Sequence, residues 1–310
     1  MRHLPNLKNF SAQEIKAILQ KASEMKANPK EFSNILEGES MAMIFQKTST
    51  RTRVSFEVAM TELGGHGIYI DWSTSNFVLS GIEYETEYLS RNVSSIMARL
   101  LHHSDLEKII SSSKVPVING CCERYHPCQA LTDILTMSEF GDLNSMHLVY
   151  VGVQNNVSNS LTILCSKLDI RLTLATPVLE KQEESFELEV QELIKKSKRI
   201  NHTTDAKEAV KTADFVYTDT WIDMQYFNDP AHADEKSTRL DLMMPYQINS
   251  DLLKGRSCKI MHDMPIHNGY EITSEMVRAP RSIIFQQTEN RLHAQKGLLW
   301  LIYKKAGISS

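Results

Sequence analysis

The clearest pattern in the sequence is an apolar run, a polar segment and then apolar residues at helical spacing. Met41 to Phe45 is continuously apolar, which is typical of a buried strand. The segment from Gln46 to Arg53 is polar. Apolar residues then recur every three or four positions, at Phe56, Ala59, Met60 and Leu63. Gly64-Gly65 follows, as expected after the last turn of a helix. The pattern predicts a strand over 41–45, a loop and a helix over 54–63.

The alternation of apolar runs with helical periodicity continues along the chain. Ser11 and Glu14 form a capping-box pattern that predicts a helix from Ala12 to Lys26. Further strands are predicted at 66–71, 95–100, 115–119, 147–151, 170–175, 214–218, 258–261 and 282–285, and further helices at 86–95, 127–140, 157–168 and 288–305. Alternating strands and helices indicate an α/β fold with parallel sheets, and 310 residues suit two domains.

Three segments have weaker patterns. Residues 72–87 are polar and irregular, and residues 178–211 are rich in charge with a helical pattern typical of a solvated face. Residues 221–245 are long and polar, which is typical of a loop that closes over a substrate. The polar residues 139–145 predict the connection between the two domains.

Composition narrows the class of protein. The chain is 42% apolar and 23% charged, as in an ordinary globular protein, and its net charge of −4 indicates neither nucleic acid nor an anionic membrane as partner. No apolar run approaches the roughly 20 residues that span a bilayer. The five cysteines are typical of reduced thiols in a cytoplasmic protein, and their spacing fits no common zinc site. We therefore expect no metal.

The polar segment after the first strand carries candidate phosphate chemistry. A helix N-terminus presents unpaired N–H groups and a partial positive charge, so it binds anions readily. Ser49, Thr50 and Thr52 add hydroxyl donors, and Arg51 and Arg53 add planar forks that match phosphate oxygens. No P-loop or GxGxxG pattern occurs, so a nucleotide is not indicated. Taken alone, the segment is equally consistent with an exposed basic helix cap.

Further short motifs follow in order, and together they resemble the aspartate/ornithine carbamoyltransferase family, most closely its ornithine-specific members. The resemblance rests on Ser49-Thr50-Arg51-Thr52-Arg53, His126-Pro127-Cys128-Gln129, Asn155-Asn156, Thr218-Asp219-Thr220-Trp221, His262-Asp263-Met264-Pro265 and Glu289-Asn290-Arg291-Leu292. It implies two doubly wound parallel-sheet domains with a cleft between them. Residues 1–143, completed by helix 288–310, would bind carbamoyl phosphate, and residues 144–287 would bind the amine.

The resemblance also implies a reaction and roles for residues. The expected reaction transfers the carbamoyl group of carbamoyl phosphate to the side-chain amine of L-ornithine, giving L-citrulline and phosphate without a cofactor. The residues implied to bind carbamoyl phosphate are Ser49, Thr50, Arg51, Thr52, Arg99, His126, Gln129 and Arg291. Those implied to bind the amine are Asn156, Asp219, Asp223, Met224, Asp263 and Met264. The catalytic set is Arg99, His126, Asp219 and Asp263. The helix that begins at Pro127 would keep His126 neutral. Family members are homotrimers with shared active sites, and the resemblance suggests a place in arginine biosynthesis.

The sequence departs from the family pattern on the amine side. Asp263 stands where the family has a cysteine, and two close carboxylates would raise the pKa of one of them. Asp223-Met224-Gln225 replaces the usual Ser-Met-Gly, and no lysine or arginine occurs between 72 and 87, the segment that reaches the neighbouring subunit in the family. Two alternatives therefore stay open: a carbamoyltransferase for another amine such as putrescine, and a catalytically silent relative that binds carbamoyl phosphate.

Overall fold

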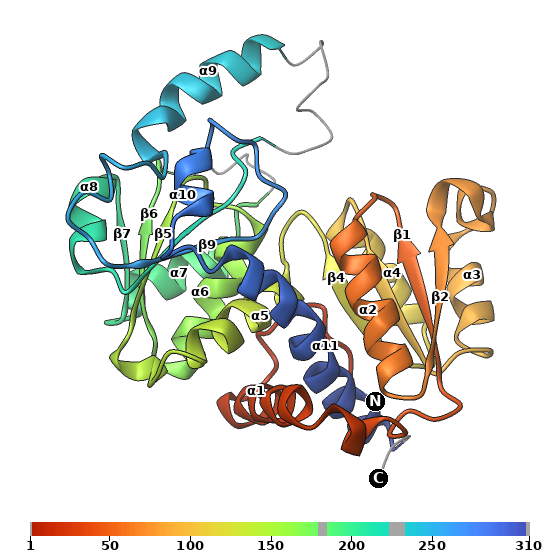
Figure 1. Cartoon of the computed structure of the whole chain (residues 1–310). Coiled ribbons are helices and arrows are strands. Elements are labelled where there is room, and N and C mark those ends of the chain that lie inside the picture. The colour runs from red at the N-terminus through yellow and green to blue at the C-terminus, as the bar shows by residue number, and fades with distance from the viewer. Residues whose placement is uncertain (1, 179–184, 223–232, 308–310) are drawn as a thin grey trace. The chain divides into compact units, whose positions relative to one another are not determined.

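The computed structural model describes residues 2–178, 185–222 and 233–307 (Figure 1). The chain divides into two compact units: unit 1 is Met1–Glu139 with Thr288–Ser310, and unit 2 is Phe140–Gln287. Each unit holds one parallel sheet, of four strands in unit 1 and five in unit 2, so the prediction of an α/β fold with two parallel sheets is confirmed. No helix in the described residues is long and apolar enough to cross a membrane.

The sheet of unit 1 brings the ends of three strands together. Its strands are β1 (Ser40–Phe45), β2 (His66–Asp71), β3 (Ser95–Arg99) and β4 (Val117–Cys121), in the order β2-β1-β3-β4. Phe45 pairs with Arg99, and Arg99 pairs with Cys121. The loops that follow β1, β3 and β4 therefore leave the same edge of the sheet, which is where parallel sheets place their ligands.

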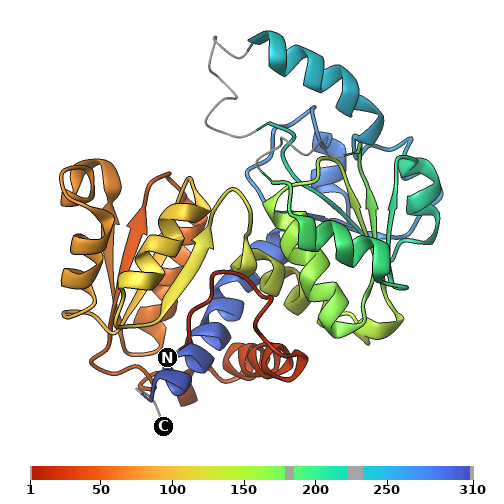
Figure 2. The same ribbon diagram turned by 180° about the vertical axis from the view of Figure 1, so that it is seen from behind.

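Helices cover both faces of this sheet. They are α1 (Ala12–Ala27), α2 (Thr50–Glu62), α3 (Ile82–Leu89), α4 (His103–Ser112), α5 (Pro127–Ser138) and the part of α11 (Ile284–Ala306) that lies in unit 1. Helix α2 lies in front of the strands in Figure 1, and α4 lies in front of them in Figure 2. Ala42 and Ile44 of β1 pack with Leu106 and Ile109 of α4, so alternate residues of this strand enter one apolar layer.

Helix α2 begins at Thr50, four residues before the predicted start. The Ser49 side chain accepts a hydrogen bond from the Thr52 backbone N–H at 3.2 Å and caps the helix. Arg51, Thr52 and Arg53 therefore belong to the first turn and not to a loop. The capping box predicted at Ser11 and Glu14 is confirmed at the start of α1.

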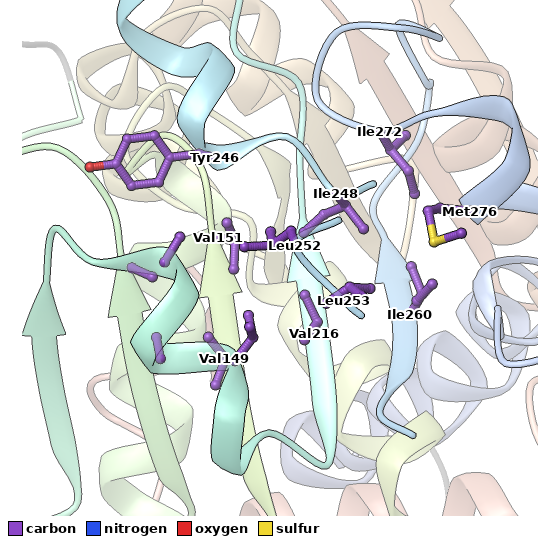
Figure 3. Packing of buried hydrophobic residues seen from close by; sticks show 14 of the residues in the cluster. Val149, Val151, Val216, Tyr246, Ile248, Leu252, Leu253, Ile260, Ile272 and Met276 are labelled. Atoms are coloured by element: carbon purple, nitrogen blue, oxygen red, sulfur yellow. The ribbon is translucent and has the colours of Figure 1, made fainter. Parts of the chain in front are cut away.

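The sheet of unit 2 has the order β7-β6-β5-β8-β9. Its strands are β5 (His147–Val151), β6 (Arg171–Ala175), β7 (Ile200–Thr203), β8 (Phe215–Thr218) and β9 (Lys259–His262), and its helices are α6 (Asn156–Leu168), α7 (Leu188–Lys196), α8 (Ala206–Ala209), α9 (Ala233–Met243) and α10 (Ser274–Arg278). Figure 3 shows one apolar layer, in which Val149, Val216 and Ile260 of three strands pack with Ile248 and Leu253. This layer fixes β5, β8 and β9 side by side.

Two predictions in unit 2 differ from the structure. The strand expected at 282–285 is wrong: Ser282 forms only an isolated bridge with Ile260, and α11 begins at Ile284. Short apolar runs suit a strand or a buried helix start equally well, so periodicity alone does not separate them. Strand β7 was not predicted, because Ile200 is its only buried residue and the strand lies at the sheet edge.

The backbones of α1 and α11 approach each other closely at Gly297. A Cβ atom on Gly297 would lie 2.9 Å from the Ala22 backbone nitrogen and 3.0 Å from the Ala22 Cβ. We expect Gly297→Val to lower the free energy of unfolding by at least about 2 kcal/mol, because neither helix backbone can give way easily. Urea denaturation measures this loss. Lys304→Val, at an exposed position of the same helix, should stay within about 1 kcal/mol, and equal losses would contradict close packing as the cause.

Candidate active site

Gln46 ties the loop after β1 to the loop after β3. The Gln46 backbone N–H donates to the Arg99 carbonyl oxygen at 2.9 Å. Its side-chain oxygen accepts from the Leu101 N–H at 2.7 Å, and its side-chain nitrogen donates to Asp105 Oδ2 at 3.1 Å. These bonds hold the start of α2 beside Arg99. No sequence signal had marked Gln46, since its partners lie more than 50 residues away.

Thr52 is the centre of the polar cluster at this edge. Its Oγ1 accepts from Ser49 Oγ at 3.1 Å, from Arg291 at 3.1 Å and from Arg99 at 3.4 Å. Thr52 and Arg291 are buried. One hydroxyl therefore gathers two guanidinium groups, which come from β3 and α11.

Gln129 links Arg291 to α5. The Gln129 side-chain oxygen accepts a hydrogen bond from Arg291, and its nitrogen donates to Asp133 Oδ1 at 2.8 Å. All three side chains are buried. An amide oxygen has two lone pairs, so Gln129 can accept from a ligand N–H while it holds Arg291. The sequence had predicted only a ligand contact for Gln129 and not this link.

His126 lies among cations at the N-terminus of α5. Burial lowers the pKa of His126 well below its ordinary value, and the charges of Arg291, Arg99, Lys47 and Arg51 lower it further. The imidazole is therefore neutral at physiological pH and can act as a hydrogen-bond donor. Burial and the four cations are the causes, whereas the sequence had suggested the helix N-terminus. Lys47 was absent from the sequence-based set.

Arg53 points to a different set of partners from Arg51. Its guanidinium carbon lies 3.9 Å from the centre of the Tyr69 ring, and its Nε lies 3.3 Å from Glu57 Oε2. Each side chain of this ion pair is nearly half exposed to solvent. Arg51, in contrast, acts electrostatically on the buried His126. The two arginines of the Ser-Thr-Arg-Thr-Arg motif are therefore separated by the turn of the helix.

In unit 2, polar side chains follow β5, β8 and β9. Asn155 caps α6 by accepting from the N–H groups of Val157 and Ser158, and its nitrogen donates to Asp219 Oδ2 at 2.7 Å. Asn156 is the first residue of α6. The Asn155 amide is therefore engaged with Asp219.

The segment after β9 contains Asp263 and Met264, which are both half-buried. Met264 has a φ of 64°, and the Met264-Pro265 peptide bond is cis. Asp223 and Met224, which the sequence had suggested for the amine, lie outside the described residues. No group of three or more His, Cys, Asp or Glu side chains in the described ranges is placed to hold a metal ion.

Comparison with known proteins agrees with this geometry along nearly the whole chain. Residues 2–139 match the family described as "Aspartate/ornithine carbamoyltransferase, carbamoyl-P binding domain", and residues 144–302 match its "Asp/Orn binding domain". The chain is 38% identical to the ornithine carbamoyltransferase of Archaeoglobus fulgidus over 309 residues, which cover 96% of each chain. It is 40% identical to an anabolic ornithine carbamoyltransferase of Pyrococcus furiosus, over 97% of this chain and 96% of that one.

Solved structures give the same result for the fold. An ornithine carbamoyltransferase from Pyrococcus furiosus superposes with a TM-score of 0.87 at 38% identity, and covers 97% of this chain and 96% of its own. An anabolic enzyme from Campylobacter jejuni superposes with a TM-score of 0.88 at 30% identity, and covers 98% of this chain and 100% of its own. The chain therefore belongs to the aspartate/ornithine carbamoyltransferase family.

Proposed function

We propose that this protein is an ornithine carbamoyltransferase, which transfers the carbamoyl group of carbamoyl phosphate to the side-chain amine of L-ornithine and yields L-citrulline and phosphate. The observation that carries the proposal is the cluster at the edge of unit 1. There, one buried neutral imidazole is surrounded by the charges of Arg51, Arg99, Arg291 and Lys47. Such a cluster suits a dianionic acyl phosphate whose carbonyl oxygen gains charge during the reaction.

The phosphate group belongs at the start of α2. Ser49, Thr50, Arg51 and Thr52 surround the first turn of this helix, where N–H groups point outward and favour an anion. Arg51 adds a planar fork that can bind two phosphate oxygens at once. We assign these four residues to the phosphate.

The carbonyl oxygen belongs beside Arg99, His126 and Arg291. Nucleophilic attack turns this oxygen into an oxyanion, and donors held in place before the reaction stabilise it most. Arg99 and Arg291 are already fixed on Thr52, and Gln129 fixes Arg291 a second time. The Gln129 oxygen also suits the carbamoyl NH₂ group. The amine belongs in unit 2, with Asp219, Asp263, Asn156, Met264 and the undescribed Asp223 and Met224 as its expected contacts.

The test is a steady-state assay of citrulline formation from carbamoyl phosphate and L-ornithine, run beside a putrescine assay. Turnover of L-ornithine is the expected result. The extra carboxylate of Asp263 favours the alternative, an amine that lacks a carboxylate group, and turnover of putrescine alone would replace ornithine as the substrate. Binding of carbamoyl phosphate without release of phosphate in the presence of any amine would overturn both substrate assignments. It would identify a catalytically silent relative.

We further propose a homotrimer with shared active sites in the cytoplasm. Support comes from unit 1, where β2 is an edge strand and several large apolar side chains are exposed: Val54, Ile68, Val78, Leu79, Tyr84 and Tyr88. Large exposed apolar patches mark interaction surfaces. The five cysteines are free and buried, which suits a reducing compartment.

Leu79→Asp should separate the subunits. Leu79 is 83% exposed within one chain, so the substitution disturbs nothing in the folded unit, yet a charge there is costly to bury between subunits. We expect the mass measured by light scattering to fall from three chains to one, with loss of activity. Leu242→Asp, at an exposed apolar position of unit 2, is the control and should leave the mass unchanged. A trimer that survives Leu79→Asp would rule out this surface.

We propose the biosynthetic direction for the reaction in the cell. Carbamoyl phosphate is a mixed anhydride, so its chemistry favours transfer to the amine over the reverse reaction. Similar proteins include one named anabolic and one named catabolic, at 40% and 37% identity, so the likeness does not decide between them. Restoration of growth to an arginine auxotroph that lacks ornithine carbamoyltransferase is the expected result.

A further inference from the structure

His126 lies at the end of a short irregular segment of unit 1. Strand β4 ends at Cys121 and helix α5 begins at Pro127, so residues 122–126, the β4–α5 connection, lie outside the helices and strands. A group that acts on a developing charge must be held within about 0.5 Å of its working position. A displacement of about 1 Å can lower a rate about 10²-fold. The contacts that fix this connection therefore bear on the reaction rate.

The thiol of Cys122 is fully buried within the β4–α5 connection. Its Sγ donates to the Tyr125 carbonyl oxygen at 3.7 Å, and the Cys122 backbone N–H donates to the same oxygen at 3.0 Å. Burial raises the pKa of this thiol to about 12, so the sulfur keeps its proton and stays a donor. The Tyr125 carbonyl belongs to the peptide group that also contains the His126 N–H. The two bonds therefore fix the plane of the peptide immediately before His126.

Two side chains from neighbouring elements approach the same sulfur atom. Asn119 Nδ2, from β4, donates to Cys122 Sγ at 3.4 Å. His103 Nδ1, from the first residue of α4, lies 3.4 Å from Cys122 Sγ. Because the thiol proton points to Tyr125, the tautomer of His103 with a proton on Nδ1 fits this contact. The sulfur therefore joins a strand, a helix and the β4–α5 connection at one point.

His103 holds the β4–α5 connection at two further places. Its ring meets the Tyr125 ring edge to face, with centroids 5.5 Å apart and an interplanar angle of 68°. Its backbone N–H donates to Glu123 Oε1 at 2.9 Å, so this carboxylate lies at the positive end of α4. His103 and Tyr125 are both buried. The first turn of α4 thus contacts three residues of the connection.

The N-terminal segment of the chain supports the β4–α5 connection as well. The Leu4 N–H donates to the Val117 carbonyl oxygen at 2.8 Å, and the Asn119 N–H donates to the Leu4 carbonyl oxygen at 2.9 Å, so this segment runs along β4. Asn119 Nδ2 also donates to the Pro5 carbonyl oxygen at 2.8 Å. Lys8 Nζ then lies 5.0 Å from the centre of the aromatic ring in the connection. The amide that contacts the sulfur is therefore itself fixed by a second element.

We propose that Cys122 and His103 are positioning residues: together they hold the β4–α5 connection so that the His126 ring stays at the carbonyl oxygen of carbamoyl phosphate. The inference rests on the proposed function and concerns the same site. Groups that orient a catalytic side chain affect the rate without touching the ligand. The inference also gives a role to a cysteine whose spacing matches no common zinc site.

The first test replaces the thiol. Cys122→Ala should lower kcat for citrulline formation about tenfold, because the peptide before His126 loses its fixed orientation. The KM for L-ornithine should stay within about twofold, since no ligand contact is removed. Cys122→Ser keeps a donor and an acceptor and should recover part of the rate. Each assay is run below the unfolding midpoint of the variant, which thermal unfolding gives.

Cys258→Ala is the matched control for this test. Cys258 is also buried, but it belongs to unit 2, so the substitution removes the same atoms away from His126. We expect a loss of thermal stability similar to that of Cys122→Ala and an unchanged kcat. An equal fall of kcat in the two variants, or an unchanged kcat in Cys122→Ala, would overturn the positioning role.

A double-variant cycle tests whether Cys122 and His103 act together. His103→Phe keeps a ring against Tyr125 and removes the nitrogen beside the sulfur, so it should lower kcat by less than Cys122→Ala does. In the double variant kcat should match that of Cys122→Ala within about twofold, because the contact between the two side chains is lost only once. Effects that multiply would show that the two residues act independently and would overturn the shared network.

The ring signals of His126 separate this inference from the proposed function. In ligand-free protein labelled with [¹³C]histidine, His126→Asn identifies these signals by their disappearance. We expect them to shift or broaden in Cys122→Ala and to keep their place in Cys258→Ala. Unchanged signals in Cys122→Ala overturn the positioning role whatever the enzyme turns over. Altered signals in a protein that forms no citrulline would overturn the proposed function and leave the support of His126 intact.

Discussion

Replacement of Arg51 by alanine is expected to lower kcat/KM for carbamoyl phosphate by about 10²–10³-fold. A hydrogen bond to a charged group contributes about 1.5–3 kcal/mol, and a planar fork makes two of them. A loss of about 3–4 kcal/mol corresponds to this range, at 1.4 kcal/mol for each factor of ten. Arg51 lies in the first turn of α2, and its charge acts on the buried His126. Steady-state kinetics with carbamoyl phosphate varied give the measurement.

Arg53 provides the matched control for this prediction. It lies two residues later on the same helix, but its guanidinium packs on Tyr69 and pairs with Glu57. Arg53→Ala removes the same charge and the same number of atoms from α2, and should change kcat/KM by less than about threefold, since exposed ion pairs contribute 0–1 kcal/mol. Equal losses in the two variants, or no loss in Arg51→Ala, would remove the phosphate from the start of α2.

Replacement of His126 by alanine should lower kcat by about 10²–10³-fold, the usual loss for one donor to a developing oxyanion. The KM for carbamoyl phosphate should change little, because the donor acts mainly after attack. His126→Asn keeps an N–H donor near the same place and should recover part of the loss. His66→Asn, at an exposed position of unit 1, serves as the control.

The pH profile gives His126 a second test. Its pKa in the folded protein is lowered well below 6.5, so the imidazole is neutral throughout the neutral range. The acid limb of kcat therefore does not come from His126, and it should keep its position in His126→Asn. In the unfolded chain this histidine binds a proton below about pH 6.5, so its contribution to the free energy of unfolding is present above that pH and is lost as the pH falls. An acid limb that disappears in His126→Asn would show that the imidazole titrates during catalysis.

Buried strands were the part of the fold that the sequence predicted best. Residues 41–45 and 148–151 are apolar along their length, and each set lies in a strand that is buried on both faces. Parallel sheets covered by helices on both sides need such sequences. The weakly apolar edge strand β7 and the helix α4 left no comparable signal, because only one residue of β7 and three of α4 are buried.

The ends of elements depended on contacts that periodicity does not contain. The start of α2 at Thr50 follows from one hydrogen bond to the Ser49 hydroxyl, and the polar residues of the first turn read as a loop without it. Ile283 and Ile284 formed a plausible strand in sequence, yet one precedes α11 and the other begins it. Local patterns set the kind of element, whereas capping and tertiary contacts set its limits.

Site residues were predictable where a motif supplies them and not where the fold supplies them. Arg51 and His126 stand out in short patterns beside a strand end. The contact of Arg291 with Thr52 joins residues 239 positions apart, and the resemblance to a family had implied only that both bind carbamoyl phosphate. Glu271 had no signal of its own, because it lies in a loop and its partner His262 stands nine residues earlier, at the end of β9. The ligand-binding roles of these residues stay predictions, which the variants above test.

Helix α11 has a consequence for synthesis on the ribosome. Its residues from Thr288 onward belong to unit 1, although the whole of unit 2 precedes them in translation. The nascent β1–β4 region ends at Cys121, so it must wait for 170 further residues before Arg291 can reach Thr52. The Tyr303 hydroxyl, which pairs with Ser95 Oγ at 2.7 Å in the finished protein, arrives later still. All residues of unit 2 are synthesised before those that complete unit 1. Unit 2 can therefore fold earlier, although most of unit 1 precedes it in the chain.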